Sequence, residues 1–130
     1  MKRYFITGIG TDVGKTIVSS IITQALQADY WKPIQAGNIE NTDKNIVKSL
    51  ISNNKTNIFN ETYLLKNPFS PHYASFLDNI NIDLNKIIIP KTDNHLVIEG
   101  AGGIMVPLNE TVLIADLISY LNCEVIIVTK

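Results

Sequence analysis

Apolar and polar positions follow two periods along the first third of the chain, and the change of period predicts strands and helices in turn. Residues 2–7 form a short aromatic and β-branched run that is typical of a strand. After Thr16 the apolar residues recur at helical spacing, which predicts a helix with one apolar face: Ile17, Val18, Ile21, Ile22, Ala25 and Leu26. A second strand is predicted over residues 30–34.

Thr42 is a candidate N-cap for a further helix, whose inward positions would be Ile46, Val47, Leu50 and Ile51. Residues 57–78 contain two prolines and mixed polar residues, and they predict loops with short helical turns. Residues 82–89 fit a helix or a strand, and their periodicity does not decide between the two.

The last third of the chain continues the alternation. A buried strand is predicted over residues 95–99, followed by a glycine-rich turn and by a strand over residues 124–128. Between them lies an amphipathic helix marked by Leu113, Ile114, Leu117, Ile118 and Leu121. Strands that alternate with helices imply an α/β fold, with a parallel sheet covered by helices on both faces.

The strand predicted over residues 124–128 is apolar on both faces, as in a strand buried from two sides, yet the chain stops two residues later. Sites in parallel α/β folds are built from loops at the carboxyl ends of the strands, and the loop that should follow this strand is absent. We therefore expect residues 1–130 to form one nucleotide-binding domain that is incomplete at its C-terminus.

Composition narrows the class of protein. Hydrophobic residues make up 45% and charged residues 18%, which indicates a globular chain, and the net charge of −1 gives no basic field for nucleic acid or an anionic membrane. No apolar run is long enough for a membrane span, so we expect a cytoplasmic protein. The single cysteine, Cys123, excludes an internal disulfide and a cysteine-rich metal site.

The strongest chemical signal is the run from Gly8 to Thr16, which lies between the first strand and the first helix. Glycines let the backbone curl around an anion, and the free N–H groups at a helix N-terminus attract phosphate. Lys15 is placed to meet the β- and γ-phosphates, and the hydroxyl of Thr16 is placed to hold Mg²⁺. The segment therefore predicts a phosphate-binding loop.

The match to the strict phosphate-loop pattern fails at one position, because Ile9 stands where the first glycine is required. A dinucleotide fold is the competing interpretation, since Gly8 and Gly10 begin its glycine pattern. That pattern then fails at Val13, where its third glycine should be, and the second strand ends in Lys32-Pro33 without an acid for a ribose. Phosphate binding is the preferred interpretation.

Polar side chains also follow the other strands, at the end of the sheet where the phosphate loop is expected. Lys32 could neutralise charge on a transferred phosphoryl group, although a lysine at a strand end often only extends into solvent. Glu99 could reach Mg²⁺, and Asp43 could supply a second oxygen or simply cap a helix. The turn Gly100–Gly103 could let backbone approach a ligand or be a flexible turn.

In their order along the chain, these motifs resemble those of the dethiobiotin synthetases, the ATP-dependent carboxylase-cyclases of biotin synthesis. The matching segments span almost the whole chain: Thr7-Gly8 with Thr11, Val13-Gly14-Lys15-Thr16, Lys32-Pro33-Ile34-Gln35-Ala36-Gly37, Thr42-Asp43, Ser70-Pro71-His72 and Glu99-Gly100-Ala101-Gly102-Gly103. Each segment alone is a weak signal, and together they are specific. The resemblance implies a fold like that of the P-loop NTPases.

The resemblance also implies roles for individual residues. It places catalytic functions at Lys32, Lys15 and Thr11, and Mg²⁺ ligands at Thr16, Asp43 and Glu99. Nucleotide and substrate contacts would come from a larger set: Asp12, Val13, Gly14, Lys15, Thr16, Ile17, Asp43, Glu99, Gly100, Ala101 and Gly102.

The substrates that the resemblance implies are ATP, CO₂ and 7,8-diaminononanoate, with Mg²⁺ as cofactor. One amine of the diamine captures CO₂ as a carbamate, the carbamate is phosphorylated by ATP, and the second amine closes the ring of dethiobiotin. A homodimer is expected for the full-length protein, with neither nucleic acid nor membrane as a partner.

The chain departs from the family pattern in three ways. Ile9 and Gly10 replace a Thr-Asp pair, and Ala36 stands where some members carry serine. Family chains also continue beyond Lys130, through a part that carries the purine pocket and much of the dimer surface. We therefore expect the 130-residue form to have little or no activity alone.

Three alternatives stay open at this level. The first is an ATP-dependent enzyme on the same scaffold, like the cobyrinic-acid amidotransferases. The second is a partner-binding ATPase switch of the ParA or MinD kind, although Ile9-Gly10 lacks the lysine that follows the first glycine in that group. The third is an incomplete domain that binds phosphate weakly and catalyses nothing.

Overall fold

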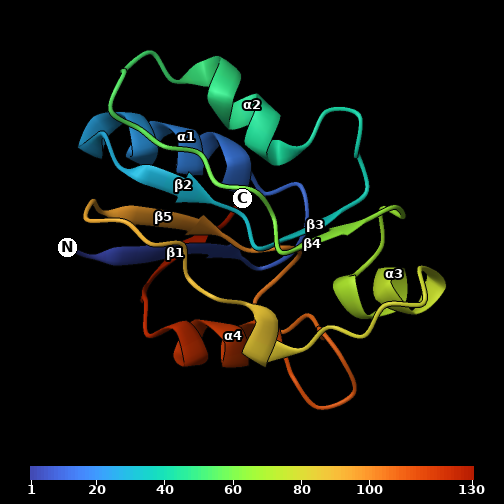
Figure 1. Ribbon diagram of the computed structural model, residues 1–130. Coiled ribbons are helices and arrows are strands. Elements are labelled where there is room, and N and C mark those ends of the chain that lie inside the picture. The colour runs from blue at the N-terminus through green and yellow to red at the C-terminus, as the bar shows by residue number, and fades with distance from the viewer.

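A four-stranded parallel sheet forms the centre of the protein in the computed structural model, which describes all residues from 1 to 130 (Figure 1). Its strands lie in the order β2 (Asp29–Trp31), β5 (Leu96–Glu99), β1 (Arg3–Gly8) and β6 (Glu124–Val128). In this register Ile6 of β1 lies opposite Glu99 on one side and Ile126 on the other. The predicted α/β fold with a parallel sheet is confirmed.

Helices cover both faces of this sheet (Figure 1). Helices α1 (Lys15–Leu26) and α2 (Asp43–Leu50) lie on one face, and α4 (Ile114–Leu121) lies on the other. Three smaller elements lie beside the carboxyl end of the sheet (Figure 1): β3 (Ile34–Ala36), β4 (Tyr63–Leu65) and α3 (Pro71–Leu77). A 3₁₀ turn, η1 (Leu84–Lys86), precedes β5 in the chain. No helix is long and apolar enough to span a membrane.

The core is divided by the sheet into two apolar clusters, because successive strand residues point to opposite faces. On the α4 side, Phe5, Trp31 and Ile98 pack with the buried leucines and isoleucines of α4. On the α1 side, Ile6 and Tyr30 belong to a smaller cluster that includes Val47 of α2. The sheet therefore presents the carboxyl ends of β1, β2 and β5 as one rigid edge.

The predicted apolar face of α1 is only partly confirmed: Val18 and Ile22 pack against the cluster that contains Ile6 and Tyr30, but Ile17, Ile21, Ala25 and Leu26 are exposed. Ile17 and Ile21 are 53% and 62% exposed, while the buried stripe is Lys15, Ser19 and Thr23. These three residues are spaced by four, so they lie on one side of the helix. This rotation of α1 turns Lys15 toward the loop between β1 and α1 and leaves Ile17 and Ile21 facing outward.

The predicted second strand is interrupted at Pro33, which has no N–H for the ladder. Strand β2 ends at Trp31, and β3 instead pairs with β4 in a separate two-stranded sheet. The sequence did not predict β4, although the short helix α3 agrees with the helical turns expected over 57–78. Residues 82–89 form neither predicted element but contain the 3₁₀ turn η1.

The composition of strand β6 predicted burial on both faces, and this prediction is wrong. Ile126 and Val128 pack toward the α1-side cluster, but Val125 and Ile127 are 44% and 53% exposed. Strand β6 pairs only with β1 and forms an edge of the sheet. Leu50, predicted to face inward from α2, is also exposed, and Val47 is the fully buried residue of that helix.

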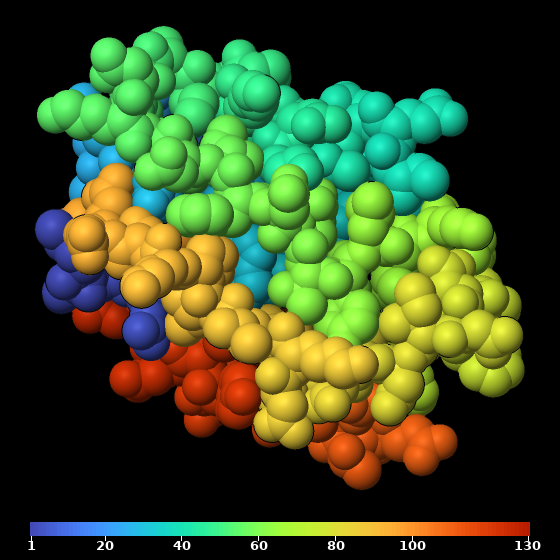
Figure 2. Space-filling view, in the orientation of Figure 1, coloured from blue at the N-terminus to red at the C-terminus, as the bar shows by residue number.

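The buried carboxylate of Asp29 joins two surface segments that lie side by side across the front of the molecule (Figure 2). It accepts hydrogen bonds from the backbone N–H of Asn57 at 2.8 Å, from the hydroxyl of Thr92 and from the side chain of Asn94. These bonds attach the segment after α2 and the segment before β5 to the first residue of β2.

Replacing Asp29 with alanine is expected to lower the free energy of unfolding by about 2–3 kcal/mol, because several hydrogen bonds to a charged, buried acceptor are lost together. Urea denaturation of the variant measures this loss. The exposed neighbour Asp93, changed to alanine, is the matched control and should alter stability by no more than about 0.5 kcal/mol. Equal stability of the two variants would show that Asp29 does not anchor these segments.

Candidate functional site

The loop between β1 and α1 has the backbone geometry of an anion-binding cradle. Gly14 is the N-cap of α1 and has φ +103°, a conformation that side chains with a Cβ rarely adopt. None of the backbone N–H groups from Gly10 to Thr16 donates a hydrogen bond to a backbone carbonyl. A row of free N–H groups at the positive end of a helix attracts anions, and phosphate above all.

Lys15, the first residue of α1, lies inside the loop that precedes it. Its side chain is buried, and its Nζ donates to the carbonyl oxygen of Gly10 at 2.8 Å. Burial lowers the pKa of this ammonium, and the nearby positive charge of Lys32 lowers it further. The ammonium is thus held where an anion bound by the loop would contact it.

The glycine-rich turn after β5 packs against this loop. A Cβ on Gly103 would lie 3.1 Å from the carbonyl oxygen of Ile9, and the N–H of Ile104 donates to the carbonyl of Gly8 at 2.9 Å. The close approach explains a glycine at position 103. The two loops therefore form one wall, and Ala101 and Gly102 face the same cavity as the phosphate loop.

Lys32 follows β2 and is fully enclosed by acceptors. Its Nζ lies 2.9 Å from Asp43 Oδ2 and 3.2 Å from Glu99 Oε2, and it donates to the carbonyl of Gly100 at 2.9 Å. Burial opposes the charged form, but the carboxylates of Glu99 and Asp43 outweigh it and raise the pKa of Lys32. The lysine does not extend into solvent, so that alternative is excluded.

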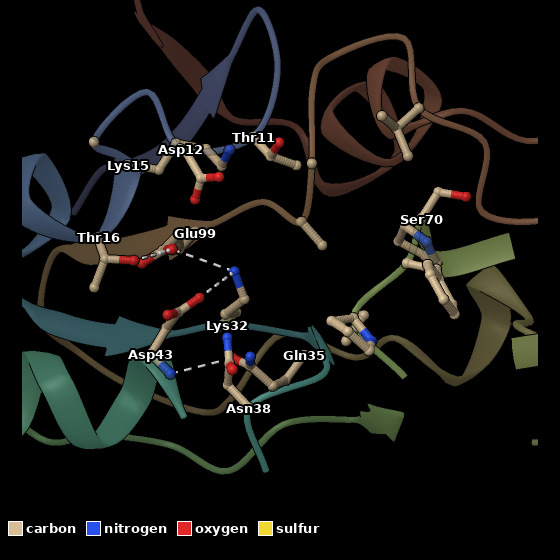
Figure 3. Close-up of a pocket in the computed structure, with 18 of the residues that line it drawn as sticks. Thr11, Asp12, Lys15, Thr16, Lys32, Gln35, Asn38, Asp43, Ser70 and Glu99 are labelled. Atoms are coloured by element: carbon tan, nitrogen blue, oxygen red, sulfur yellow. Dashed lines mark hydrogen bonds and ion pairs between the residues drawn. The ribbon is translucent and has the colours of Figure 1, made fainter. Parts of the chain in front are cut away.

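Glu99 ends β5 with its carboxylate almost fully buried. Its Oε2 accepts from the hydroxyl of Thr16 at 2.8 Å as well as from Lys32, and its Oε1 accepts from the phenol of Tyr30 at 2.8 Å. The parallel register brings these groups together, because β1 and β2 both flank β5. Figure 3 shows Thr16, Lys32, Asp43 and Glu99 pointing toward one another.

Asp43 is the first residue of α2, and the side chain of Thr42 caps that helix by accepting from the N–H of Asn45. Asp43 is therefore free to face Lys32. Its own N–H donates to Oε1 of Gln35, whose Nε2 in turn donates to the carbonyl of Gly37. Gln35 was part of a recognised motif, but its role in orienting the start of α2 was not predicted.

These side chains line a single cavity of about 540 Å³ (Figure 3). Most residues predicted from the sequence lie on it: Thr11, Asp12, Gly14, Lys15, Thr16, Ile17, Lys32, Asp43, Glu99, Ala101 and Gly102. Val13 and Gly100 do not line it. Val13 packs against Gly8, and Gly100 contributes its carbonyl to Lys32.

The cavity has further lining residues that sequence reasoning had not assigned a role. They come from the loops around β3, α3 and the glycine turn: Gln35, Ala36, Asn38, Pro68, Phe69, Ser70, Pro71 and Val106. The motif Ser70-Pro71 was a signal for part of this wall. No sequence signal pointed to Asn38, Phe69 and Val106, because single loop residues belong to no periodic pattern.

The chemistry of the donors suits a hard divalent cation. The Thr16 hydroxyl and the carboxylates of Asp43 and Glu99 are oxygen ligands of the kind that Mg²⁺ prefers. The ammonium of Lys32 already lies between the two carboxylates, so this point attracts positive charge. No group of three or more His, Cys, Asp or Glu side chains is arranged to hold a metal ion, so such a cation would also depend on the hydroxyl and on phosphate oxygens.

The sequence matches a protein family described as an AAA domain over residues 2–130. It is 57% identical to an ATP-dependent dethiobiotin synthetase of Christiangramia forsetii, with 91% of this chain and 57% of that protein covered. It is 52% identical to the synthetase of the same name from Cytophaga hutchinsonii, with 100% and 63% covered.

The chain is 46% identical to the synthetase of that name from Chlamydia pneumoniae, with 100% of this chain and 58% of that protein covered. The resemblance recognised from the motifs is thus confirmed. The chain spans about three fifths of the length of these relatives.

Proposed function

The chain belongs to the AAA domain family, and from that premise we propose that it forms the nucleotide-binding part of an ATP-dependent dethiobiotin synthetase. The proposed reaction converts 7,8-diaminononanoate, CO₂ and ATP to dethiobiotin, ADP and phosphate. The names of the relatives support this activity over an amidotransferase or a partner-binding ATPase switch. The proposed domain covers residues 1–130.

One observation carries the proposal. A single cavity contains a row of unpaired loop N–H groups, the ammonium groups of Lys15 and Lys32, the buried carboxylate of Glu99 and the partly exposed carboxylate of Asp43. The first feature suits a triphosphate, and the two carboxylates suit a metal that accompanies it. The wall opposite the loop, around Ala36 and Ser70, leaves room for a second substrate.

In this proposal the loop N–H groups hold the phosphates of ATP and Lys15 contacts the β- and γ-phosphates. Thr16, Asp43 and Glu99 would hold Mg²⁺, which when bound supplies neutralisation of the phosphate charge. Lys32 stays protonated beside the carboxylates and faces the point where charge develops during transfer. Thr11 lines the cavity near the proposed carbamate.

The chemistry needs little from side chains beyond position and charge. A carbamate is already an anionic nucleophile: its oxygen attacks the γ-phosphorus, and the bond between that phosphorus and the ADP oxygen breaks. The second amine then attacks the carbamoyl carbon, phosphate leaves, and the amine protons pass to solvent. Orientation of bound reactants can account for about 7–11 kcal/mol of such a barrier, which agrees with a site that lacks a dedicated base.

The expected homodimer, the cytoplasmic location and the absence of nucleic-acid and membrane partners are part of the same proposal. They are supported by the likeness to the synthetases and by the near-neutral net charge of −1. The partners that the cavity itself suits are small anions and amines.

Ligand binding is the test of this function, because the chain spans only about three fifths of its relatives. Calorimetry should detect binding of ATP with Mg²⁺. A carbamate signal in ¹³C NMR should then appear when the protein is mixed with labelled bicarbonate and the diamine. Binding of ATP that is indifferent to the diamine, with no carbamate signal, would contradict the synthetase assignment.

A further inference from the structure

Tyr30 is a buried residue of β2 that the proposed reaction does not use. Its ring belongs to the apolar cluster on the α1 side, together with Ile6 and Val97. Its hydroxyl donates to Oε1 of Glu99 at 2.8 Å, and no second partner of this hydroxyl is present. The register sets Tyr30 beside Val97, two residues before Glu99 on the neighbouring strand, so the side chain reaches along the strand to the carboxylate.

The two oxygens of Glu99 therefore face different surroundings. Oε1 is engaged by the phenol inside the core, while Oε2 faces the cavity and accepts from Thr16 and Lys32. A carboxylate that has one oxygen fixed cannot rotate freely about its last bond. The phenol donates to this oxygen from inside the core, where Tyr30 is completely buried.

We propose that Tyr30 is a positioning residue for the cation site, which fixes the carboxylate of Glu99 so that only Oε2 is presented to Mg²⁺. The inference rests on the proposed function, because it takes Glu99 as a ligand of that metal. Groups that orient a metal ligand through its second oxygen commonly set the affinity of the site.

A purely structural role for Tyr30 makes a different prediction. If the phenol only satisfied a buried carboxylate, its loss would weaken the fold and reduce ATP binding equally with and without metal. If it orients Oε2, its loss would reduce only the part of ATP affinity that depends on Mg²⁺. The two roles are therefore separated by comparing ATP affinity in Mg²⁺ with ATP affinity in a chelator.

The experiment uses Tyr30→Phe, which keeps the ring and removes the hydroxyl. Calorimetry should show affinity for ATP in Mg²⁺ falling by about tenfold or more, with unchanged affinity for ATP in the chelator. Tyr63→Phe is the matched control, because its hydroxyl accepts from the N–H of Asp83 outside the cavity. That variant should bind ATP as the wild type does under both conditions.

A double-mutant cycle tests whether Tyr30 acts through Glu99. In Glu99→Asp the carboxylate is shorter by one methylene and moves away from the phenol, so adding Tyr30→Phe should change ATP affinity in Mg²⁺ by less than about twofold. An undiminished effect of Tyr30→Phe in that background overturns the inference, and so does wild-type affinity of the single variant in Mg²⁺.

The wild type separates this inference from its premise. If Mg²⁺ strengthens ATP binding to the wild type, and Tyr30→Phe does not reduce this gain in affinity, only the positioning role of Tyr30 is refuted. If Mg²⁺ has no effect on the wild type at all, the cation site itself is refuted, and the proposed function loses its metal.

Discussion

Lys15→Ala is expected to weaken the binding of ATP with Mg²⁺ at least about 100-fold, because a charge-assisted contact worth about 3 kcal/mol is lost. The ammonium contacts only the carbonyl of Gly10 in the loop, so its removal should leave the fold intact. The free N–H groups of the loop would remain, but without a cation they hold a triphosphate weakly. Calorimetry with ATP and Mg²⁺ measures the loss.

The control for this experiment is Lys48→Ala, which removes an exposed lysine from the far part of α2. It should bind ATP normally, which excludes a general effect of net charge. Thermal melting of both variants establishes that they are folded. Nucleotide affinity within twofold of the wild type in Lys15→Ala would refute the phosphate-loop assignment, whatever the relatives are named.

Lys32→Met should have the largest effect on stability. Removing this ammonium leaves Asp43 and Glu99 facing one another without a counter-charge, and breaking a buried ion pair in this way costs about 3–5 kcal/mol. A cation that the two carboxylates bind should restore part of the loss. We therefore expect Mg²⁺ to raise the melting temperature of the variant more than that of the wild type.

Urea denaturation measures the loss of stability, and thermal melting with and without saturating Mg²⁺ measures the effect of the cation. Lys2→Met is the control, since Lys2 pairs with Glu124 on the surface and its loss should have little consequence. If Lys32→Met were as stable as the wild type, the lysine would not balance the two carboxylates. If Mg²⁺ acted equally on both proteins, the carboxylates would not form a cation site.

The sequence predicted those parts of the site whose functional residues are neighbours in the chain or stand at the ends of strands. Gly14, Lys15 and Thr16 are contiguous, and the change from strand to helix around them is visible in the pattern. Glu99 was predicted because parallel strands end at a common edge, and the structure places it 3.2 Å from Lys32.

The residues that were missed reach their positions through the register of the strands and the rotation of the helices, which no local sequence pattern determines. The hydrogen bond from Tyr30 to Glu99 joins residues 69 positions apart, and it exists only because β2 pairs with β5 in one register. Ile17 and Ile21 were expected to face inward, but the rotation of α1 buries Lys15, Ser19 and Thr23 instead and leaves both isoleucines exposed. Asn38 and Val106 reach the cavity from loops whose course is set by distant contacts.

Because β1 lies between two strands, the parts of the site differ in their resistance to local unfolding. Strand β1 pairs with a strand on both sides, whereas the outer side of β2, which leads into Lys32, carries only a single bridge, from Tyr30 to Ile58. Fluctuations that open a sheet begin at its margins, so amide protons at Phe5 and Ile6 should exchange with solvent long after those at Tyr30 and Trp31. Brief opening at β2 would thus release Lys32, while Glu99, on a strand that is paired on both sides, and the loop before α1 kept their places. Under the proposed function, nucleotide binding would persist on warming after phosphoryl transfer had failed.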